Sequence, residues 1–404
     1  MSARDRVRDN GRAMPRQSRE ALVSSLFHAQ ARRGGGLAAA LRAVQVVALV
    51  QVLLLDGAGA TGAIAPAVRV VPGFRVRTFA SGLSHPTAMA YGPDGRIYVT
   101  QTEGTVVAVK GGTTRPAVVL RGLHTPLGLA WRGRTLFVSE QGRIERTVLS
   151  RRGRFSPRHV LLSRLPYGQH QQDNVVVSRS GWLYVGSGST CDACQERDRR
   201  SAAILSLRPD GTHFRVFATG LRNPFGLAVQ PESGHLYATV NGQDNLGSRR
   251  DPEPADVLVR VRRGAWYGWP RCWPDARHLT MRGRCRGVTP PAAFLEPHSS
   301  ADGLTFYRGT AFPRSYRGNI FVAEWGQYYS ARFGRRVVRV VLGRDGRARR
   351  ITTFASGFEH PLALLVDKRG ALLVADWGRG VVYRIESRSN RSTRDALQMG
   401  DRQG

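Results

Sequence analysis

One pattern recurs six times along this chain: a Gly-Leu or Gly-Phe step, an apolar strand, a tight turn, and a second apolar strand that ends near Gly. The clearest copies are FASGLSHPTAMAYGPDGRIYVTQTEGTVVAVK at 79–110 and FASGFEHPLALLVDKRGALLVADWGRGVVYRIE at 354–386. The other copies lie at 120–149, 165–211, 217–261 and 303–343. Short alternating strands between turn residues are typical of β-sheet, and a repeat of about forty residues with four strands is typical of a propeller blade.

Six such units predict an all-β fold over residues 66–387, a six-bladed β-propeller with four-stranded blades, because closing a ring buries both faces of each blade. A helical solenoid is excluded because the segments alternate with period two and carry Pro and Gly at short intervals. Residues 245–300 are expected to form a long insertion between the fourth and fifth blades. The polar, charged residues 388–404 are expected to form a disordered tail.

The N-terminal region, residues 1–65, has the residue order of an export signal. Residues 1–42 are polar and basic, 43–55 form an apolar run, and small residues follow. This order predicts a basic region followed by a signal peptide or a membrane anchor, although the run is short for a membrane span. We therefore expect an exported protein that is secreted, periplasmic or anchored on the outer side of the cytoplasmic membrane. A disordered tail leading into a buried strand is the alternative.

The net charge of the chain is +32, and Arg carries nearly all of the positive charge because Lys110 and Lys368 are the only lysines. A field of this sign favours anionic partners such as cell-wall polymers, lipid headgroups or an anionic cofactor. We therefore expect association with an anionic cell surface. The sequence has no zinc-finger spacing, basic zipper or ribonucleoprotein signature, so specific nucleic-acid binding is not expected.

The chain has four cysteines, at positions 191, 194, 272 and 285. In an exported protein they are expected to form two local disulfides, Cys191–Cys194 and Cys272–Cys285. A metal site or free thiols are the alternatives, but the spacing of the second pair is poor for zinc.

Two segments in the third and fourth repeats carry polar residues where a propeller has its inner loops. His170, in Gly-Gln-His-Gln-Gln-Asp, comes just before a strand, where an imidazole with a pKa near 6.5 is suited to act as a general base. Arg222-Asn223-Pro224 stands where the first and last repeats hold His-Pro, and Arg is suited to bidentate pairing with a carboxylate. A structural histidine and a surface turn are the plainer interpretations of the same residues.

Two further segments lie downstream. Asn241-Gly242-Gln243, with Asp256 beyond it, is rich in oxygen ligands of the kind that bind Ca²⁺, although a solvated acidic loop has the same composition. Tyr267-Gly268-Trp269 is suited to form an aromatic wall against a flat ligand or a sugar, and equally to simple packing.

The order of these motifs resembles that of the pyrroloquinoline quinone (PQQ)-dependent glucose/sorbosone dehydrogenase family, soluble quinoproteins with a six-bladed propeller. The likeness covers roughly residues 70–386 and is strongest between 160 and 275. The motifs are GQHQ (168–171), WLYVGSGSTCDAC (182–194), FATGLRNPFGLA (217–228), NGQDNLG (241–247), WYGWPRC (266–272) and GLTFYRG (303–309).

The resemblance implies PQQ-dependent oxidation of a sugar or other polyol/aldose hydroxyl, with electrons passed to an external acceptor. It implies that His170 removes the hydroxyl proton as hydride passes to the quinone. Arg222, Asn223 and Asn241 match residues that contact PQQ. Two sets of positions match metal contacts: carbonyls at Gly242 and Gln243 for the cofactor's Ca²⁺, and Asp256 and Tyr267 near a second, structural Ca²⁺.

The last two blades depart from the family pattern. The fifth lacks the expected Lys, and Trp325 stands where the sorbosone-like branch has His. The sixth has Glu359-His360-Pro361 where an Arg is expected. The resemblance therefore leaves His360, or else Arg332 or Arg335, to take the place of the missing cofactor contacts.

Two other functions are compatible with the same fold, because a propeller alone does not specify chemistry. One is a non-catalytic binding propeller descended from a dehydrogenase, which would account for the altered fifth and sixth blades. The other is a metal-dependent, lactonase-type hydrolase, which needs carboxylates from several blades to meet at the centre. The candidates for that site follow inner strands of four blades: Glu103, Glu140, Glu324 and Asp376.

Overall fold

The computed structural model describes residues 68–244, 254–327 and 331–388. These residues form strands, joined by turns, and one 3₁₀ helix at Arg314–Tyr316. No helix among them is long and apolar enough to cross a membrane. The predicted signal region and C-terminal tail lie outside the described residues.

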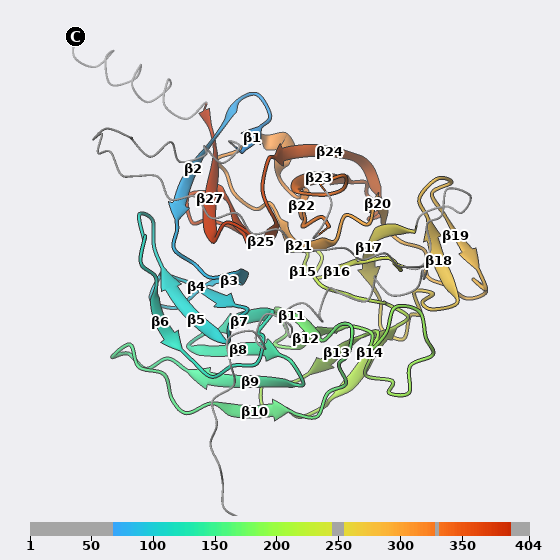
Figure 1. Ribbon diagram of the computed structural model, residues 1–404, viewed down its shortest axis with the longest axis horizontal. Helices are drawn as coiled ribbons and strands as arrows, with labels where there is room; N and C mark the ends of the chain where they lie inside the picture. Colours follow the sequence, from blue (N-terminus) through green and yellow to red (C-terminus); the bar gives the residue numbers. More distant parts are fainter. Residues whose placement is uncertain (1–67, 245–253, 328–330, 389–404) are drawn as a thin grey trace, which may run out of the picture. The chain divides into compact units, whose positions relative to one another are not determined.

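The strands form six small antiparallel sheets arranged as a ring, which confirms the predicted six-bladed propeller (Figure 1). The first three blades follow the chain without interruption. Blade one is β3 (Pro86–Tyr91), β4 (Ile97–Gln101), β5 (Thr105–Val109) and β6 (Ala117–Leu120). Blade two is β7 (Gly128–Arg132), β8 (Thr135–Glu140), β9 (Arg143–Val148) and β10 (His159–Leu162). Blade three is β11 (Gln172–Val177), β12 (Leu183–Ser187), β13 (Ala203–Leu207) and β14 (Arg215–Thr219).

Each of the other three blades includes a strand from outside its sequence repeat: β20 (Ala293–Pro297) in blade four, β1 (Arg69–Val70) in blade five and β2 (Phe74–Ala80) in blade six. Blade four is β15 (Leu227–Val229), β16 (Leu236–Val240), β17 (Ala255–Val261) and β20. Blade five is β21 (Ala301–Phe306), β22 (Ile320–Glu324), β23 (Arg336–Leu342) and β24 (Ala348–Ser356), with the short β1 added outside. Blade six is β25 (Pro361–Val366), β26 (Leu372–Asp376), β27 (Val381–Ser387) and β2.

The ring is closed by β2, which comes from the start of the described chain and pairs with β27 at its end. The register runs from Phe74 opposite Ser387 to Ala80 opposite Val382. The innermost strands contact their neighbours in the cyclic order β3, β7, β11, β15, β21, β25 and back to β3. Closure of this kind leaves only short sheet edges. The sequence repeats are offset from the blades, because each repeat begins with the end of the preceding blade's outer strand. In the first repeat, the leading FASG at 79–82 overlaps β2, the outer strand of blade six.

The predicted insertion between blades four and five is wrong in position, because it lies inside blade four. After β17 the chain forms a hairpin of β18 (Cys272–Asp275) and β19 (Thr280–Gly283) and then returns to add β20 to the same sheet. Cys272–Cys285 closes this hairpin, and Cys191–Cys194 closes a loop of blade three, so both predicted disulfides are confirmed.

The hydrophobic core lies between adjacent blades, since the inner strands of each blade are buried on both faces. The second strands accordingly read as continuous apolar runs, such as IFVAE in β22 and LLVAD in β26, and every residue of these two strands is buried. Four innermost strands carry a β-bulge near their first residue, between Pro86 and Ala88, Gln172 and Val175, Ala301 and Leu304, and Pro361 and Ala363. Bulges re-aim side chains, and here they do so at the face that carries the candidate site.

Candidate active site on one face of blades three and four

The candidate residues share one face of the ring because of strand direction. In each blade the second strand runs antiparallel to the innermost strand, so the start of the first and the end of the second meet at the same face. His170 precedes β11, Arg222 and Asn223 precede β15, and Asn241 follows β16. The structure therefore brings His170 and Asn241, which are 71 positions apart in the sequence, to the same face.

His170 is half-buried and its proton arrangement follows from its neighbours. Its Nδ1 lies 3.0 Å from Oγ of Ser189, and that hydroxyl donates to the carbonyl of Cys191 at 2.6 Å. Because the single hydroxyl proton is directed at Cys191, Oγ must accept from Nδ1–H. The neutral imidazole therefore has its lone pair on Nε2, as a general base needs.

The environment also keeps His170 neutral. Burial, and then the positive charge of Arg222, lower the pKa of His170 well below its ordinary value of 6.5. At neutral pH the imidazole is thus available to accept a proton.

Arg222 is buried and pairs with two carboxylates of the protein itself. Its Nη2 atom donates to Asp192 Oδ1 at 2.7 Å and to Asp244 Oδ2 at 2.6 Å, and its Nε donates to the Asp192 carbonyl at 3.2 Å. The side chain of Arg222 is 4% exposed, against 22% for Asp192 and 40% for Asp244. The guanidinium is therefore fixed in place by the loop that carries Asp192.

Asn223 and Asn241 link two loops of blade four to blade five. Asn223 Nδ2 donates to Asn241 Oδ1 at 2.7 Å, and Asn241 Nδ2 donates to the Ala301 carbonyl at 3.1 Å. A Cβ on Gly188 would collide with His170 and lie 2.8 Å from Asn223 Oδ1. The absence of a side chain at Gly188 thus lets the base and the amide approach each other.

Four buried oxygens near this face have no hydrogen-bond partner in the described part of the chain. Three are amide oxygens, which accept hydrogen bonds, and the fourth is a carboxyl oxygen: Gln171 Oε1, Asn223 Oδ1, Gln243 Oε1 and Asp173 Oδ2. An unpaired buried acceptor is costly, so a cation or a bound donor is the natural complement of such a group. Oxygen ligands are those that Ca²⁺ prefers, and the residues present therefore fit a site that holds Ca²⁺ beside a polar cofactor.

A buried pair of carboxyl groups, Asp173 and Asp302, was missed by the sequence analysis. Asp173 belongs to β11 and Asp302 to β21, and Asn241 donates to Asp302 Oδ1 at 3.3 Å. Burial, and then the charge of Asp302, raise the pKa of Asp173 well above its usual value, and burial likewise raises the pKa of Asp302. Asp173 ends the segment that carries His170, but its pairing with Asp302 could not be read from the sequence, because it depends on two strands of different blades.

The other predicted metal residues have protein partners. Asp256 Oδ1 accepts from the Gly242 amide at 2.8 Å, and Oδ2 accepts from Ser299 Oγ and the Ala301 amide at 3.0 and 2.9 Å. The Tyr267 hydroxyl donates to the carbonyl of residue 260 at 2.6 Å and accepts from the amide of residue 262 at 2.9 Å. Asp256 thus ties the loop after β16 to blade five. The metal roles of these residues stay predictions.

A pocket with an empty volume of about 450 Å³ lies beside Arg222, between blade four and the β18–β19 hairpin. It is lined by Tyr267, Trp269 and Trp273 and by Asn241 and Gln243, among other residues. The indole of Trp269 also donates to the Asp192 carbonyl at 2.9 Å. The predicted aromatic segment therefore borders the candidate site.

Blades five and six contribute aromatic residues to a cluster beside His360. His360 Nδ1 lies 3.1 Å from the Trp325 carbonyl, so Nδ1–H donates and Nε2 keeps the lone pair. Burial is the main cause that lowers the pKa of His360. We call the surrounding group the axial cluster; it consists of Leu127, Phe225, Trp325, Leu362 and Trp377.

The carboxylates proposed for a lactonase-type centre are held within their own blades. The amides of Glu359 and His360 donate to Asp376 at 2.8 and 2.9 Å, and Arg336 contacts Glu324 at 2.5 Å. His124 donates to Glu140, and Glu103 pairs with His85. The acidic residues at similar points of the four blades therefore hold loops and neighbouring strands of their own blades.

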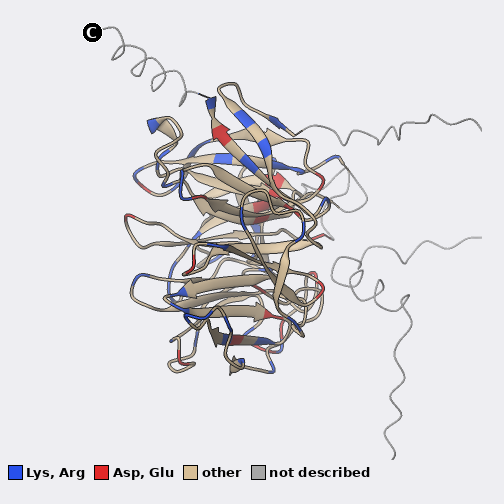
Figure 2. Ribbon diagram, turned by 90° about the vertical axis from the view of Figure 1, so that its left-hand side faces the viewer, with Lys and Arg blue, Asp and Glu red and all other residues tan. Residues whose placement is uncertain are grey.

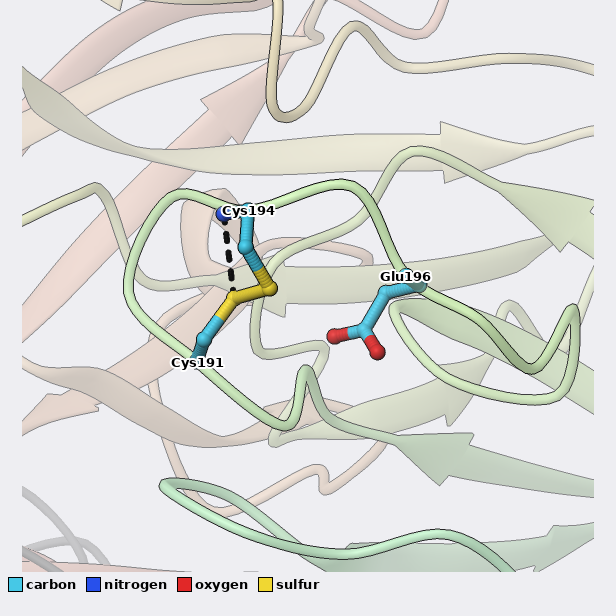
Figure 3. A group of neighbouring side chains, drawn as sticks. All are labelled: Cys191, Cys194 and Glu196. Atoms are coloured by element: carbon cyan, nitrogen blue, oxygen red, sulfur yellow. Dashed lines mark hydrogen bonds between the residues drawn. A yellow bond between two sulfur atoms is a disulfide. The ribbon is translucent and has the colours of Figure 1, made fainter.

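Among the described residues, one group of three potential ligands lies close enough to hold a metal: Cys191, Cys194 and Glu196, within 4.8 Å (Figure 3). Both cysteines are in the disulfide, so they offer no thiolate. The described carboxylates therefore do not form the central cluster that lactonase chemistry needs.

Fold and site define a class: a six-bladed β-propeller whose blades three and four present a neutral histidine, a buried arginine and amide oxygens at one face. The family model for Glucose / Sorbosone dehydrogenase matches residues 137–374, more than half of the chain. The chain belongs to that family, which confirms the resemblance seen in the motifs.

Known relatives agree with this assignment. The chain is 22% identical over 298 residues to the aldose sugar dehydrogenase of Escherichia coli, covering 59% of this chain and 75% of the relative. Two solved structures share its fold. The PQQ-bound aldose sugar dehydrogenase of Streptomyces coelicolor has a TM-score of 0.61 at 21% identity, covering 80% of this chain and 99% of that one. The PQQ domain of pyranose dehydrogenase from Coprinopsis cinerea has a TM-score of 0.69 at 19% identity, covering 80% and 97%.

Proposed function

We propose that this protein is a quinoprotein that uses PQQ and Ca²⁺ to oxidise a hydroxyl of a sugar or other polyol/aldose and passes the electrons to an external acceptor. The observation that carries the proposal is the state of His170. Its Nδ1–H is engaged by Ser189, its Nε2 holds a lone pair, and its pKa is low enough to keep it neutral. A general base needs these three properties.

In this proposal Arg222, Asn223, Asn241 and His360 would hold PQQ, and Gly242 and Gln243 would hold Ca²⁺. When bound, PQQ supplies a two-electron acceptor and Ca²⁺ supplies a Lewis acid. His170 takes the proton of the substrate hydroxyl at Nε2. The neighbouring Arg222 disfavours protonation of His170 before substrate binds, because like charges repel.

Arg222 suits an anionic cofactor even though it already contacts two carboxylates. Its described hydrogen bonds use Nε and Nη2, and none uses Nη1. A guanidinium has five N–H donors, so the donors on Nη1 remain for a cofactor carboxylate. The paired aspartates fix the direction in which those donors point.

The test is a titration of the purified protein with PQQ in the presence and absence of Ca²⁺, followed by dye reduction with a panel of aldoses. Saturable quinone binding and sugar-dependent dye reduction that is lost in His170→Ala would support the proposal. No binding at high micromolar PQQ would sink it. His159→Ala is a matched control, because it removes an exposed imidazole on β10, the outer strand of blade two.

A second candidate is a non-catalytic binding propeller. The observation that favours it is the neutralisation of Arg222 by Asp192 and Asp244, together with the aromatic stacking of His360. On this alternative, His170→Ala leaves ligand binding unchanged and no sugar reduces the dye. The same titration therefore separates the two.

We also propose that the protein is exported, secreted, periplasmic or anchored outside the cytoplasmic membrane, and that it associates with an anionic surface. Two disulfides suit an oxidising compartment. Lys and Arg are spread over the blades rather than gathered in one stripe (Figure 2), which favours diffuse electrostatic attraction. Fractionation of cells tests the first proposal, and salt-dependent release from isolated envelopes tests the second.

A further inference from the structure

The loop closed by the Cys191–Cys194 disulfide contacts Arg222 directly and His170 through Ser189. We call residues 190–196 the disulfide loop. The Cys191 carbonyl accepts from Ser189, the hydroxyl that holds His170. The Asp192 carbonyl accepts from Arg222 and from Trp269, and the Asp192 carboxylate accepts from Arg222 again and from the Asp244 amide.

The base depends on this loop through one hydroxyl. Ser189 is fully buried, and the single proton of its hydroxyl can be donated either to the Cys191 carbonyl or to His170 Nδ1. The Cys191 carbonyl at 2.6 Å takes that proton, which leaves Oγ as an acceptor for His170 Nδ1–H. Displacing the carbonyl would free the hydroxyl to donate to Nδ1 instead. The imidazole would then carry its proton on Nε2, where it cannot act as a base.

The arginine depends on the same loop through Asp192. Two of the three described hydrogen bonds of Arg222 end on Asp192, and the third ends on Asp244, whose amide is itself held by Asp192. Asp192 is therefore the common partner of the guanidinium and of the loop after β16. Its position is set from both sides, because the cysteines that flank it are joined.

The rest of the loop is built to stay closed. Glu196 accepts from the Thr190 amide at 2.6 Å and from the Thr190 hydroxyl at 2.8 Å, and the Cys194 amide donates to Cys191 Sγ at 3.0 Å (Figure 3). These bonds cross the loop at the same point as the disulfide. The loop is thus a small closed ring with Asp192 at its tip.

We propose that the disulfide loop is the positioning element of the active site, with Ser189 setting the tautomer of His170 and Asp192 setting the direction of Arg222. This inference rests on the proposed dehydrogenase function. Ser189 and Asp192 act through His170 and Arg222 and are positioning residues rather than catalytic ones. The second disulfide, Cys272–Cys285, closes the β18–β19 hairpin and serves as the matched control.

The experiment compares Cys191→Ser/Cys194→Ser with Cys272→Ser/Cys285→Ser in the full chain. Histidine ¹⁵N NMR of the protein without added PQQ reports the His170 tautomer, with the signal assigned by its loss in His170→Gln. In the wild type we expect a protonated Nδ1. Opening the disulfide loop should produce a mixture of tautomers, and opening the hairpin should not. With PQQ, Ca²⁺ and sugar, the first variant should lose at least about tenfold in kcat, since general-base catalysis is commonly worth about 10²–10⁴-fold.

Unchanged tautomer signals in Cys191→Ser/Cys194→Ser would overturn the proposal, whatever the activity. If that variant does not fold, Ser189→Ala provides the same test by removing a single hydroxyl, and an unaltered Nδ1–H tautomer there has the same meaning. The NMR result does not need the cofactor. A wild type that fails to turn over sugar therefore counts against the proposed function alone, and an active wild type with an unaffected loop variant counts against this inference alone.

Discussion

The imidazole of His360 is stacked on the indole of Trp325, with ring centroids 3.8 Å apart and planes inclined by 22°. The two residues come from different blades, since Trp325 follows β22 and His360 precedes β25. His360 Nδ1–H also donates to the Trp325 carbonyl. A ring stack and a hydrogen bond between the same two residues join blade five to blade six beside the axial cluster.

His360→Ala should therefore destabilise the protein by about 2–3 kcal/mol, because it removes a buried ring stack and a hydrogen bond. His360→Phe keeps a ring in the same place and should lose only about 1 kcal/mol, the usual net value of the hydrogen bond. Urea unfolding at pH 7.5 measures both. Equal losses for the two variants would show that the stack contributes nothing.

The sequence allowed the ring of blades and the shared face of the candidate residues to be predicted, because both depend on local repeats. Alternating strands and turns indicate the bounds of a blade, and the strand order within a blade determines the face on which its inner loops lie. His170, Arg222 and Asn223 could be named for that reason. Closure by β2 and the return of β20 were not predicted, since each depends on pairing with a strand that is distant in sequence.

The partners of the named residues could not be predicted in the same way. Asp192 lies in the visible CxxC segment, but its role depends on a loop that folds over Arg222. The stack of Trp325 on His360 joins two blades, and the sequence marked each residue only as a departure from the family pattern. Contacts between blades arise from packing, which no repeat encodes.

The activity should depend on pH through His170. The base must be neutral, so kcat/KM should rise with pH through the pKa of His170 and then level off. Because burial and Arg222 lower that pKa well below 6.5, the plateau should already be reached at pH 6.5. Arg222→Met removes a nearby positive charge and should move the rising limb to higher pH. A rising limb centred above pH 6.5 in the wild type would contradict this assignment. The pH profile of the rate of PQQ-loaded protein at aldose concentrations well below KM provides the measurement.

The two carboxylates that pair with Arg222 should differ in importance. Asp192 is the less exposed partner and Asp244 is 40% exposed, so solvent screens the second pair more strongly. Asp192→Asn should cost about 3 kcal/mol, in the range for breaking a buried pair. Asp244→Asn should cost about 1 kcal/mol or less, as for exposed pairs. Denaturant midpoints of the two single variants measure the difference, and a larger loss for Asp244→Asn would reverse our ranking.

Closure of the ring should depend on Phe74, the first residue of β2. Its ring contacts Phe312 and Phe354 edge-on, at centroid distances of 4.7 and 5.0 Å, and it is 4% exposed. Phe74→Ala should destabilise the protein by about 3–5 kcal/mol, the usual cost of removing a buried aromatic side chain. Phe74→Leu, which refills most of the space, should cost clearly less. Thermal unfolding compares them, and a loss below about 1 kcal/mol for Phe74→Ala would show that β2 is not needed for closure.

The buried Glu140 should make stability fall as the pH rises. Burial raises the pKa of Glu140 from 4.5 to about 7, and one of its oxygens, Oε1, has no hydrogen-bond partner in the described structure, with Arg143 Nε 3.6 Å away as its ion-pair partner. Between pH 4.5 and 7 the folded protein therefore binds more protons at this group than the unfolded chain does, so unfolding becomes easier as pH increases. Glu140→Gln cannot ionise and should remove this slope. Relative to the wild type it should gain about 1–3 kcal/mol between pH 5 and pH 8. Urea midpoints across this range provide the test, with the exposed Glu232→Gln as control. Parallel curves for the wild type and Glu140→Gln would show that Glu140 is ionised in the folded protein throughout.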